Sequence, residues 1–187
     1  MNTRICIGIP SNGTVKTRTL FAITRMLNRS PLKFEVLTHD SCYIHVNREA
    51  LVKRAIEGGF SHILFIDSDM FFDTGSAEQL LNRDKDIIGA DYNYRELPLR
   101  GTLKELEGEE EPINGLKKCA GIATGFLMIK TSVFKKLKHP WFFYEMDENG
   151  LTVQGDDIWF CNRAREAGFD IWCDTTVNIK HIGEYLF

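Results

Sequence analysis

Residues 63–69, with the sequence ILFIDSD, constrain the fold of this chain more than any other segment. Four consecutive apolar residues predict a strand that is buried on both faces, as the central strands of parallel sheets are. Two carboxylates follow where this strand would end. Ligands of open α/β sheets bind beyond the carboxyl ends of the strands. The segment therefore predicts an interior strand with a polar site at its end.

Strand and helix patterns alternate along the first half of the chain. Short apolar runs predict strands, and apolar residues at helical spacing predict helices. The expected strands are 5–9, 34–37, 63–66 and 86–90, and the expected helices are 15–27, 47–57 and 76–81. Such alternation is typical of βαβ units. We therefore expect an α/β fold with a central, mostly parallel sheet flanked by helices.

The second half of the chain is less regular. Its patterns predict strands at 120–130, 141–144, 169–172 and 177–179, a helix after Thr131 and another at 156–167. The acidic stretch 105–111 predicts a solvated loop. Because no repeat, linker or low-complexity segment divides the sequence, we expect a single domain over 1–187 whose two halves meet at about residue 92.

Charge and cysteine content exclude several classes of protein. The formal net charge of -3 does not favour nucleic acid or an anionic membrane as a partner. An anionic ligand would need a metal ion, an arginine or backbone amides to hold it. No apolar run is long enough for an integral membrane segment, and the N-terminal residues lack a secretory pattern. Five cysteines without a C-x-x-C pair predict reduced thiols in a cytoplasmic protein, not a disulfide framework or a zinc site.

Asp67 and Asp69 are the first candidate site residues. Side chains two positions apart in an extended segment point the same way, so both carboxylates could face one site. Carboxylate oxygens are ligands that suit Mg²⁺ or Mn²⁺. A strand that simply ends in a polar turn would show the same pattern, and the pair by itself does not decide between the two.

Asp156 and Asp157 open the helix at 156–167. Aspartate is favoured at the cap and in the first turn of a helix, and capping needs only one carboxylate. We expect Asp156 to cap the helix and Asp157 to face the site. His181 lies near the end of the chain, and a lone histidine is more often structural than a ligand. It becomes a candidate because two carboxylate ligands need a further partner.

Seven segments, taken in order, give the chain a family resemblance. It resembles glycosyltransferases of the GT-A type, in particular the short, soluble proteins of bacteria and viruses that are similar to glycosyltransferase family 2. The segments cover nearly the whole chain: 9–10 (IP), 47–52 (NREALV), 65–70 (FIDSDM), 84–92 (DKDIIGADY), 123–129 (ATGFLMI), 155–168 (GDDIWFCNRAREAG) and 181–183 (HIG). The chain departs from the family in having Asp-Asp at 156–157 for Glu-Asp, in having Val-Asn-Arg at 46–48 for Ala-Arg-Asn, and in being short.

The resemblance implies a nucleotide-binding half at about 1–92 and an acceptor-binding, catalytic half at about 93–187. The residues that it assigns to the nucleotide or the donor sugar are Pro10, Asn12, Asp40, Arg48, Asp67, Ser68 and Gly125. It assigns Asp69 and His181, with Asp67 beside them, to a Mn²⁺ or Mg²⁺ ion. Asp157 matches the catalytic carboxylate of the family, and Asp156 is its neighbour.

The activity that follows is sugar transfer from a nucleotide-diphosphate sugar, with a UDP-sugar as the default donor. The acceptor hydroxyl would belong to an unknown sugar, a lipid-linked molecule or a protein. A divalent ion would stabilise the departing diphosphate, and a carboxylate would take the proton of the acceptor. Direct displacement with one base would invert the anomeric centre.

Two other functions fit parts of the pattern. A haloacid-dehalogenase-type phosphatase also uses a strand-borne D-x-D pair and Mg²⁺, but that family has Thr or Val two positions after the second Asp, where Phe71 stands here. A nucleotide-sugar-binding module without catalysis would suit a short chain. Dinucleotide-binding and P-loop proteins are excluded, because neither of their glycine-rich motifs is present.

Overall fold

The computed structural model describes residues 3–108 and 111–183. Its elements up to residue 90 follow the predicted alternation, with ends shifted by a few residues. They are β1 (Ile5–Ser11), α1 (Thr17–Arg29), β2 (Phe34–Asp40), α2 (Ile44–Glu57), β3 (His62–Ile66), β4 (Met70–Phe72), α3 (Ser76–Asn82) and β5 (Ile87–Gly89). Only the short strand β4 has no counterpart in the prediction.

The later elements differ more from expectation. They are β6 (Leu116–Cys119), β7 (Phe126–Lys130), α4 (Thr131–Phe134), β8 (Glu145–Met146), β9 (Thr152–Gln154), α5 (Asp156–Glu166), β10 (Ile171–Asp174) and β11 (Ile179–His181). The sequence did not predict β6, and the strand expected at 120–130 begins only at Phe126. The acidic stretch 105–111 includes positions 109 and 110, which lie outside the described residues.

The prediction of a strand at 141–144 is wrong. The backbone N–H groups of Trp141 and Phe142 both donate to Oε1 of Glu49, at 2.6 Å each, and not to a neighbouring strand. The side chain of Phe142 is fully buried, where its ring packs against that of Phe160. Trp141 and Phe142 thus pack against the core without forming a strand.

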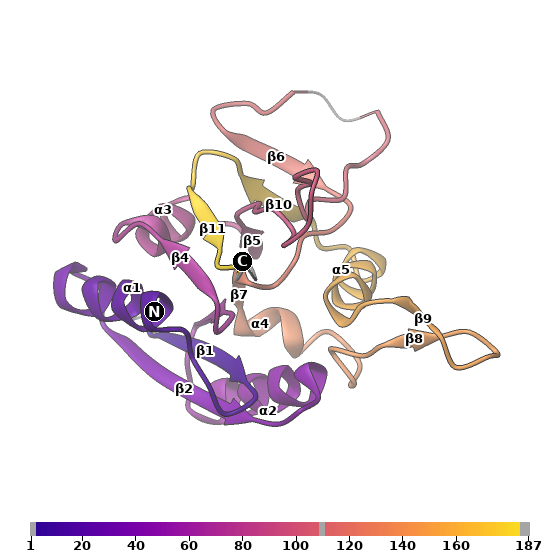
Figure 1. The fold of residues 1–187 in the computed structure, drawn as a ribbon, viewed down its shortest axis with the longest axis horizontal. Coiled ribbons are helices and arrows are strands. Elements are labelled where there is room, and N and C mark those ends of the chain that lie inside the picture. The colour runs from indigo at the N-terminus through magenta and orange to yellow at the C-terminus, as the bar shows by residue number, and fades with distance from the viewer. Residues whose placement is uncertain (1–2, 109–110, 184–187) are drawn as a thin grey trace.

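Seven strands form one sheet in the order β2–β1–β3–β7–β5–β10–β6 (Figure 1). The pairs β1–β2, β1–β3 and β5–β10 are parallel. The pairs β3–β7, β5–β7 and β6–β10 are antiparallel. The sheet is therefore mixed: β2, β1, β3, β5 and β10 run in one direction, and β7 and β6 run in the opposite one. The expectation of a mostly parallel sheet holds for the strand directions but not for the strand pairs, because β7 lies antiparallel between β3 and β5.

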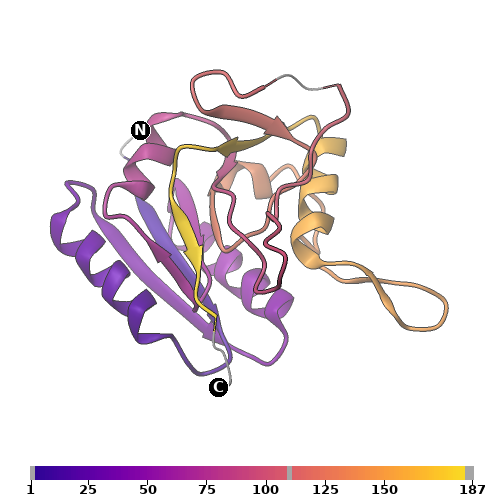
Figure 2. The ribbon, with the colours of Figure 1, turned by 45° about the horizontal axis from the view of Figure 1, so that its top comes forward.

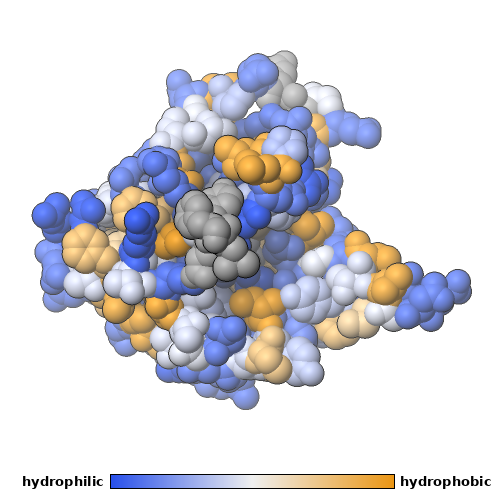
Figure 3. Space-filling view, viewed as in Figure 1, coloured by the Kyte–Doolittle hydropathy of each residue, from blue (hydrophilic) through white to orange (hydrophobic). Residues whose placement is uncertain are grey.

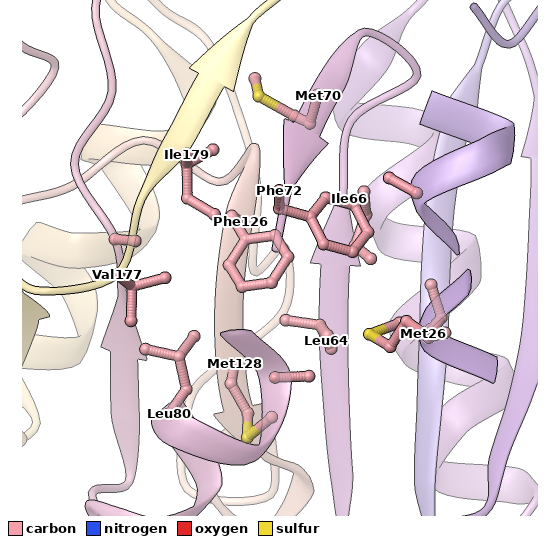
Figure 4. Close-up of a cluster of buried hydrophobic side chains, with 14 of the residues drawn as sticks. Met26, Leu64, Ile66, Met70, Phe72, Leu80, Phe126, Met128, Val177 and Ile179 are labelled. Carbon is pink, nitrogen blue, oxygen red and sulfur yellow. The ribbon is translucent and has the colours of Figure 1, made fainter. Parts of the chain in front are cut away.

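Helices cover both faces of this sheet, and each face has its own apolar core. Along β3 the side chains alternate: Leu64 and Ile66 belong to one core, Ile63 and Phe65 to the other. The first core includes residues of α1, α3, β4 and β11, some of which Figure 4 shows. The second includes residues of α2, α4 and α5. Figure 2 shows α1 and α2 on opposite sides of the strands between them. β3 is thus buried on both faces, as its sequence predicts.

Three further features bear on function. The hairpin of β8 and β9 extends away from the rest of the molecule beside α5 (Figures 1 and 2). All five cysteines are free, and only Cys42 is exposed. Within the described ranges, no helix is long and apolar enough to cross a membrane.

Candidate active site

The turn formed by Asp67, Ser68 and Asp69 follows β3 directly, so it lies at the carboxyl end of an interior strand. Backbone hydrogen bonds fix this turn from three separate segments. The N–H of Asp67 donates to the carbonyl of Gly125 (3.1 Å), that of Lys16 to Ser68 (2.8 Å) and that of Ile182 to Asp69 (2.8 Å). The turn is therefore held between the start of α1, the start of β7 and the end of β11.

Arg48 on α2 joins this turn to the start of α5. Its Nη1 atom lies 2.6 Å from Oδ2 of Asp156, and its Nη2 atom lies 3.2 Å from Oδ1 of Asp67. The side chains of Arg48 and Asp156 are only 6% and 5% exposed, whereas that of Asp67 is 21% exposed. Buried charges need partners of opposite sign. Here the guanidinium of Arg48 forms ion pairs with two carboxylates that are far apart in the sequence. Both acidic motifs therefore belong to a single site.

The neighbouring Asn47 has a different, structural task. Its buried amide donates to the backbone carbonyls of Ser11 (2.8 Å) and Ser41 (3.0 Å), and its Oδ1 atom lies 2.8 Å from Nδ1 of His39. Asn47 thus ties the carboxyl ends of β1 and β2 to α2. The chain has Asn-Arg at positions 47–48, where the family that it resembles has Arg-Asn. In this order it is the arginine, and not the asparagine, that contacts Asp67.

The assignment of Asp156 as a helix cap is wrong. Gly155 occupies the N-cap position and Asp156 is the first helical residue, whose carboxylate is taken up by Arg48. Asp157 accepts the backbone N–H of Ile158 at 2.7 Å and stays partly accessible. Burial raises the pKa of Asp157, although the charge of Arg48 and the bond from Ile158 oppose this. A carboxylate with a raised pKa is a stronger proton acceptor, which suits a general base.

Asp69 faces two basic side chains. Its Oδ2 atom lies 3.0 Å from Nη1 of Arg95 and 3.3 Å from Nε2 of His181. Burial by itself raises the pKa of Asp69, but the hydrogen bond and charge of His181, with the charge of Arg95, outweigh burial and lower it. Nδ1 of His181 lies 3.2 Å from the carbonyl oxygen of Asn93, which only accepts, so Nδ1 carries a proton. Nε2, the other ring nitrogen, faces the carboxylate of Asp69.

Asp69 and His181 fit the donor set of a divalent cation. Either a proton on Nε2 or a cation can lie between this nitrogen and the carboxylate oxygen of Asp69. In an octahedral Mg²⁺ site, two adjacent ligand atoms, each about 2.1 Å from the ion, lie roughly 3 Å from each other. The observed distance between Nε2 of His181 and Oδ2 of Asp69, 3.3 Å, is close to this value. A bond from the other ring nitrogen to a backbone carbonyl also orients metal-bound histidines.

Asp67 does not complete a three-residue site with this pair, because its carboxylate pairs with Arg48. Among the described residues, no group of three His, Cys, Asp or Glu side chains lies close enough to hold a metal ion. Mg²⁺ sites commonly use one or two protein carboxylates and fill the remaining positions with phosphate oxygens and water. The geometry therefore suits an ion that binds together with a phosphorylated ligand.

A pocket of about 720 Å³ opens beside His181. The segment 93–97, Leu99 and the end of β11 line it, together with the basic side chains of Lys16, Arg95 and Lys180. Basic side chains and a nearby cation site favour an anionic ligand. These basic side chains supply local positive charge for such a ligand, although the net charge of the chain is -3.

Gly125 stands where the molecule leaves no room for a side chain. A Cβ atom there would lie 2.5 Å from Cε of Met70 and closer still to the hydroxyl of Tyr92. That hydroxyl accepts the N–H of Gly125 at 3.1 Å. Packing against Tyr92 thus explains the glycine without a ligand, and the predicted contact of Gly125 with a donor sugar stays a prediction.

The other residues assigned to the nucleotide gather at the carboxyl ends of β1 and β2. Ser11 and Asp40 are partners in the parallel register, and the Ser11 hydroxyl donates to Oδ1 of Asp40. Pro10 is buried within β1, and Asn12 follows as an exposed residue. β1 pairs with β3, so these residues lie along the sheet edge that carries Asp67. Their contacts with a nucleotide stay predictions.

Known proteins share this arrangement of elements. A scan against protein-family models gave no match, and a search of curated proteins gave none either. Among solved structures, 151 chains match. One of them is the crystal structure of A197 from STIV, with a TM-score of 0.70 and 19% sequence identity over 97% of this chain and 87% of that chain. The likeness is one of fold.

Sequence reasoning missed the loop that follows β5. Oδ1 of Asp91 accepts three backbone N–H groups, from Tyr92, Thr102 and Leu103, at 2.8–3.0 Å. This carboxylate orders the loop that brings Asn93 to His181 and Arg95 to Asp69. The only signal in the sequence was Asp91 at the end of an apolar run, and nothing there indicated that its loop would reach the end of the chain.

Proposed function

We propose that this chain is a metal-dependent glycosyltransferase of the GT-A type, which moves a sugar from a nucleotide-diphosphate sugar to an acceptor hydroxyl. One observation carries the proposal: Arg48 pairs with both Asp67 and Asp156, so the D-x-D turn and the carboxylates of α5 form one site. Such a transferase needs a cation-binding pair and a proton acceptor near each other. The family resemblance of the seven sequence segments supports the same conclusion.

Asp69 and His181 would hold Mn²⁺ or Mg²⁺, with Asp67 near the ribose. When bound, the ion would offset the negative charge that develops on the departing diphosphate. The carboxylates of the site outnumber its arginines, which favours a cation: Asp67, Asp69, Asp156 and Asp157 stand against Arg48 and Arg95. The side chain of Arg95 is 53% exposed, so it is free to leave Asp69 for a phosphate oxygen when the ligand binds.

Asp157 would act as the catalytic base. The proton of the acceptor hydroxyl passes to its carboxylate while the oxygen attacks the anomeric carbon of the donor and the bond to the diphosphate breaks. Direct displacement of this kind inverts the anomeric centre. The first turn of α5 favours negative charge, which keeps Asp157 ionised in spite of its burial. Arg48 orients Asp156 and thereby the start of α5.

Pro10, Asn12, Asp40 and Ser68 would contact the nucleoside, and the basic pocket beside His181 would take the diphosphate. UDP is the nucleotide that the resemblance favours. We place the protein in the cytoplasm, in line with its reduced cysteines.

A thermal-shift panel tests this function. UDP, GDP, CDP and ADP are each added with and without Mn²⁺, because a ligand that binds only the folded state raises its stability by mass action. We expect one nucleotide, UDP, to raise the melting temperature in the presence of Mn²⁺ only, and the matching nucleotide sugar to be turned over.

Other outcomes identify the competing functions. Hydrolysis of an aryl phosphate without nucleotide binding would indicate a phosphatase. Nucleotide-sugar binding without hydrolysis or transfer, in the presence of acceptors, would indicate a binding module. Either result contradicts the proposal.

A further inference from the structure

We propose that five aromatic side chains beside Asp157 form a subsite for a neutral saccharide acceptor. This aromatic platform consists of Tyr43, His45, Phe143, Tyr144 and Trp159. The inference rests on the proposed glycosyltransferase activity and names the class of its acceptor.

Ring contacts join the platform across three segments of the chain. The ring centroid of His45, in the first turn of α2, lies 5.2 Å from that of Tyr144 and 6.2 Å from that of Phe143. The ring centroid of Tyr43 lies 6.1 Å from that of His45, and the ring centroid of Phe143 lies 5.7 Å from that of Trp159 on α5. Aromatic rings at these separations pack favourably, so the five side chains form one continuous surface.

The platform adjoins the ion pair of Arg48 and Asp156, next to the proposed base. Trp159 is three residues after Asp156 on α5, and His45 is three residues before Arg48 on α2. Side chains at this spacing are neighbours on a helix face. Burial raises the pKa of the Tyr144 hydroxyl, and the charges of Asp156 and Asp157 raise it further while Arg48 lowers it. An acceptor seated on the platform would therefore have a hydroxyl within reach of the carboxylates.

The platform presents both apolar and polar groups. The side chains of Tyr43 and Phe143 are 62% and 46% exposed, so the platform presents aromatic surface to solvent. Within the part of the chain that the structure describes, the hydroxyls of Tyr43 and Tyr144 have no hydrogen-bond partner. A sugar ring offers matching groups, since its C–H faces pack on aromatic rings and its hydroxyls bond to polar edges.

The charge around the platform distinguishes a neutral acceptor from an anionic one. The segment 141–154 carries Glu145, Asp147 and Glu148 but neither lysine nor arginine. Phosphorylated acceptors and anionic lipid surfaces are bound through lysine and arginine. The hairpin instead exposes Met146, Leu151 and Val153, and Figure 3 shows apolar side chains along it and near its base. One cation does lie against the platform, since the guanidinium of Arg163 is 5.7 Å from the ring centroid of Trp159. Against the three carboxylates of the segment it leaves no excess of positive charge, so the surroundings favour a neutral saccharide.

Saturation-transfer NMR with four neutral tetrasaccharides tests the proposal: cellotetraose, maltotetraose, chitotetraose and mannotetraose. The variants are Tyr43→Ala and Phe143→Ala. Phe21→Ala is the matched control, because Phe21 is 60% exposed but lies on α1. We expect at least one tetrasaccharide to bind through its ring C–H protons. Its affinity should fall about three- to tenfold in each platform variant, the scale of one lost aromatic contact, and stay unchanged in Phe21→Ala.

The proposal is overturned if none of the tetrasaccharides binds, if both platform variants bind as the wild type does, or if Phe21→Ala loses binding equally. Binding to vesicles of anionic phospholipid that Tyr43→Ala abolishes would overturn it in favour of a membrane. UDP binding with Mn²⁺, measured in the same samples, separates this proposal from the proposed function. UDP binding without saccharide binding contradicts only the acceptor class, and the reverse contradicts only the transferase.

Discussion

Arg48 and Asp156 form a buried ion pair, with Nη1 of the arginine 2.6 Å from Oδ2 of the aspartate, although 108 positions separate them in the sequence. Burial lowers the pKa of Arg48, but the charges of Asp67 and Asp156 outweigh burial and raise it, so the guanidinium stays charged. The pair fixes where the start of α5 lies relative to the D-x-D turn. The arrangement of the site and the stability of the fold therefore depend on the same contact.

The first prediction concerns that pair. Asp156→Asn leaves the charge of Arg48 buried with only Asp67 to balance it. Removing one partner of a buried ion pair costs about 3–5 kcal/mol of the free energy of unfolding. Urea unfolding at pH 7 measures this loss. The control is Glu96→Gln, which breaks an exposed pair with Arg100 and should change stability by about 0.5 kcal/mol or less. Equal losses in the two variants would show that Arg48 does not depend on Asp156.

The second prediction concerns the catalytic base. Asp157→Asn keeps the size of the side chain but removes proton acceptance, so transfer should fall by roughly 10²–10⁴-fold while UDP affinity stays nearly unchanged. In the wild type the base must be ionised, and burial raises the pKa of Asp157 above the ordinary 3.8. Activity should therefore fall as the pH drops through this raised pKa. Steady-state kinetics across pH check both points, and a variant that retains full turnover rules out Asp157 as the base.

The third prediction is a pH-dependent loss of stability away from the site. Asp174 has a fully buried carboxylate, 2.7 Å from Nε of Arg83 and 2.6 Å from the hydroxyl of Thr176. Burial raises its pKa, but the bonds from Arg83 and Thr176 outweigh this and lower the pKa below 3.8. The stabilisation is therefore present above pH 3.8 and is lost as the pH falls through the lowered pKa.

Asp174→Asn should accordingly cost about 1.5–3 kcal/mol at pH 7, as lost hydrogen bonds to a charged group do, and progressively less as the pH falls below 4. Urea unfolding of both proteins at a series of pH values gives the difference. A difference that does not shrink in acid would contradict the role assigned to this carboxylate.

The fourth prediction concerns the glycine behind the D-x-D turn. Gly125→Ala places a Cβ atom against Met70 and the hydroxyl of Tyr92, and overpacking of this kind costs about 1–3 kcal/mol. Gly75→Ala is the control, since nothing lies within 4 Å of a Cβ there. Thermal unfolding of both variants tests this, and comparable melting temperatures would mean that Tyr92 moves aside without cost.

Part of this structure could be predicted from short stretches of sequence. The residues 63–69 indicate a buried strand with two carboxylates at its end, because apolar continuity and residue type are local properties. The direction of β7 could not be predicted in the same way. Phe126–Lys130 is an apolar run that would suit either direction, and only its place between β3 and β5 makes it antiparallel.

The contacts within the site were less accessible to sequence reasoning. The pairing of Arg48 with Asp156, and of His181 with Asn93, joins segments that are brought together only by the completed sheet. The residue type of Asp156 predicts a cap, because aspartate commonly has that role at the start of a helix. Its carboxylate instead pairs with Nη1 of the buried Arg48, whose Nη2 atom is already paired with Asp67.

The central claim is that Asp69 and His181 hold a divalent ion together with a nucleoside diphosphate. Calorimetric titration of UDP with and without Mn²⁺ tests it most directly, in the wild type, Asp69→Ala and His181→Ala, with the exposed Asp170→Ala as control. We predict that Mn²⁺ strengthens UDP binding in the wild type and in Asp170→Ala, and that each of the other two variants loses this dependence. A metal dependence that is unchanged in both Asp69→Ala and His181→Ala would contradict the account.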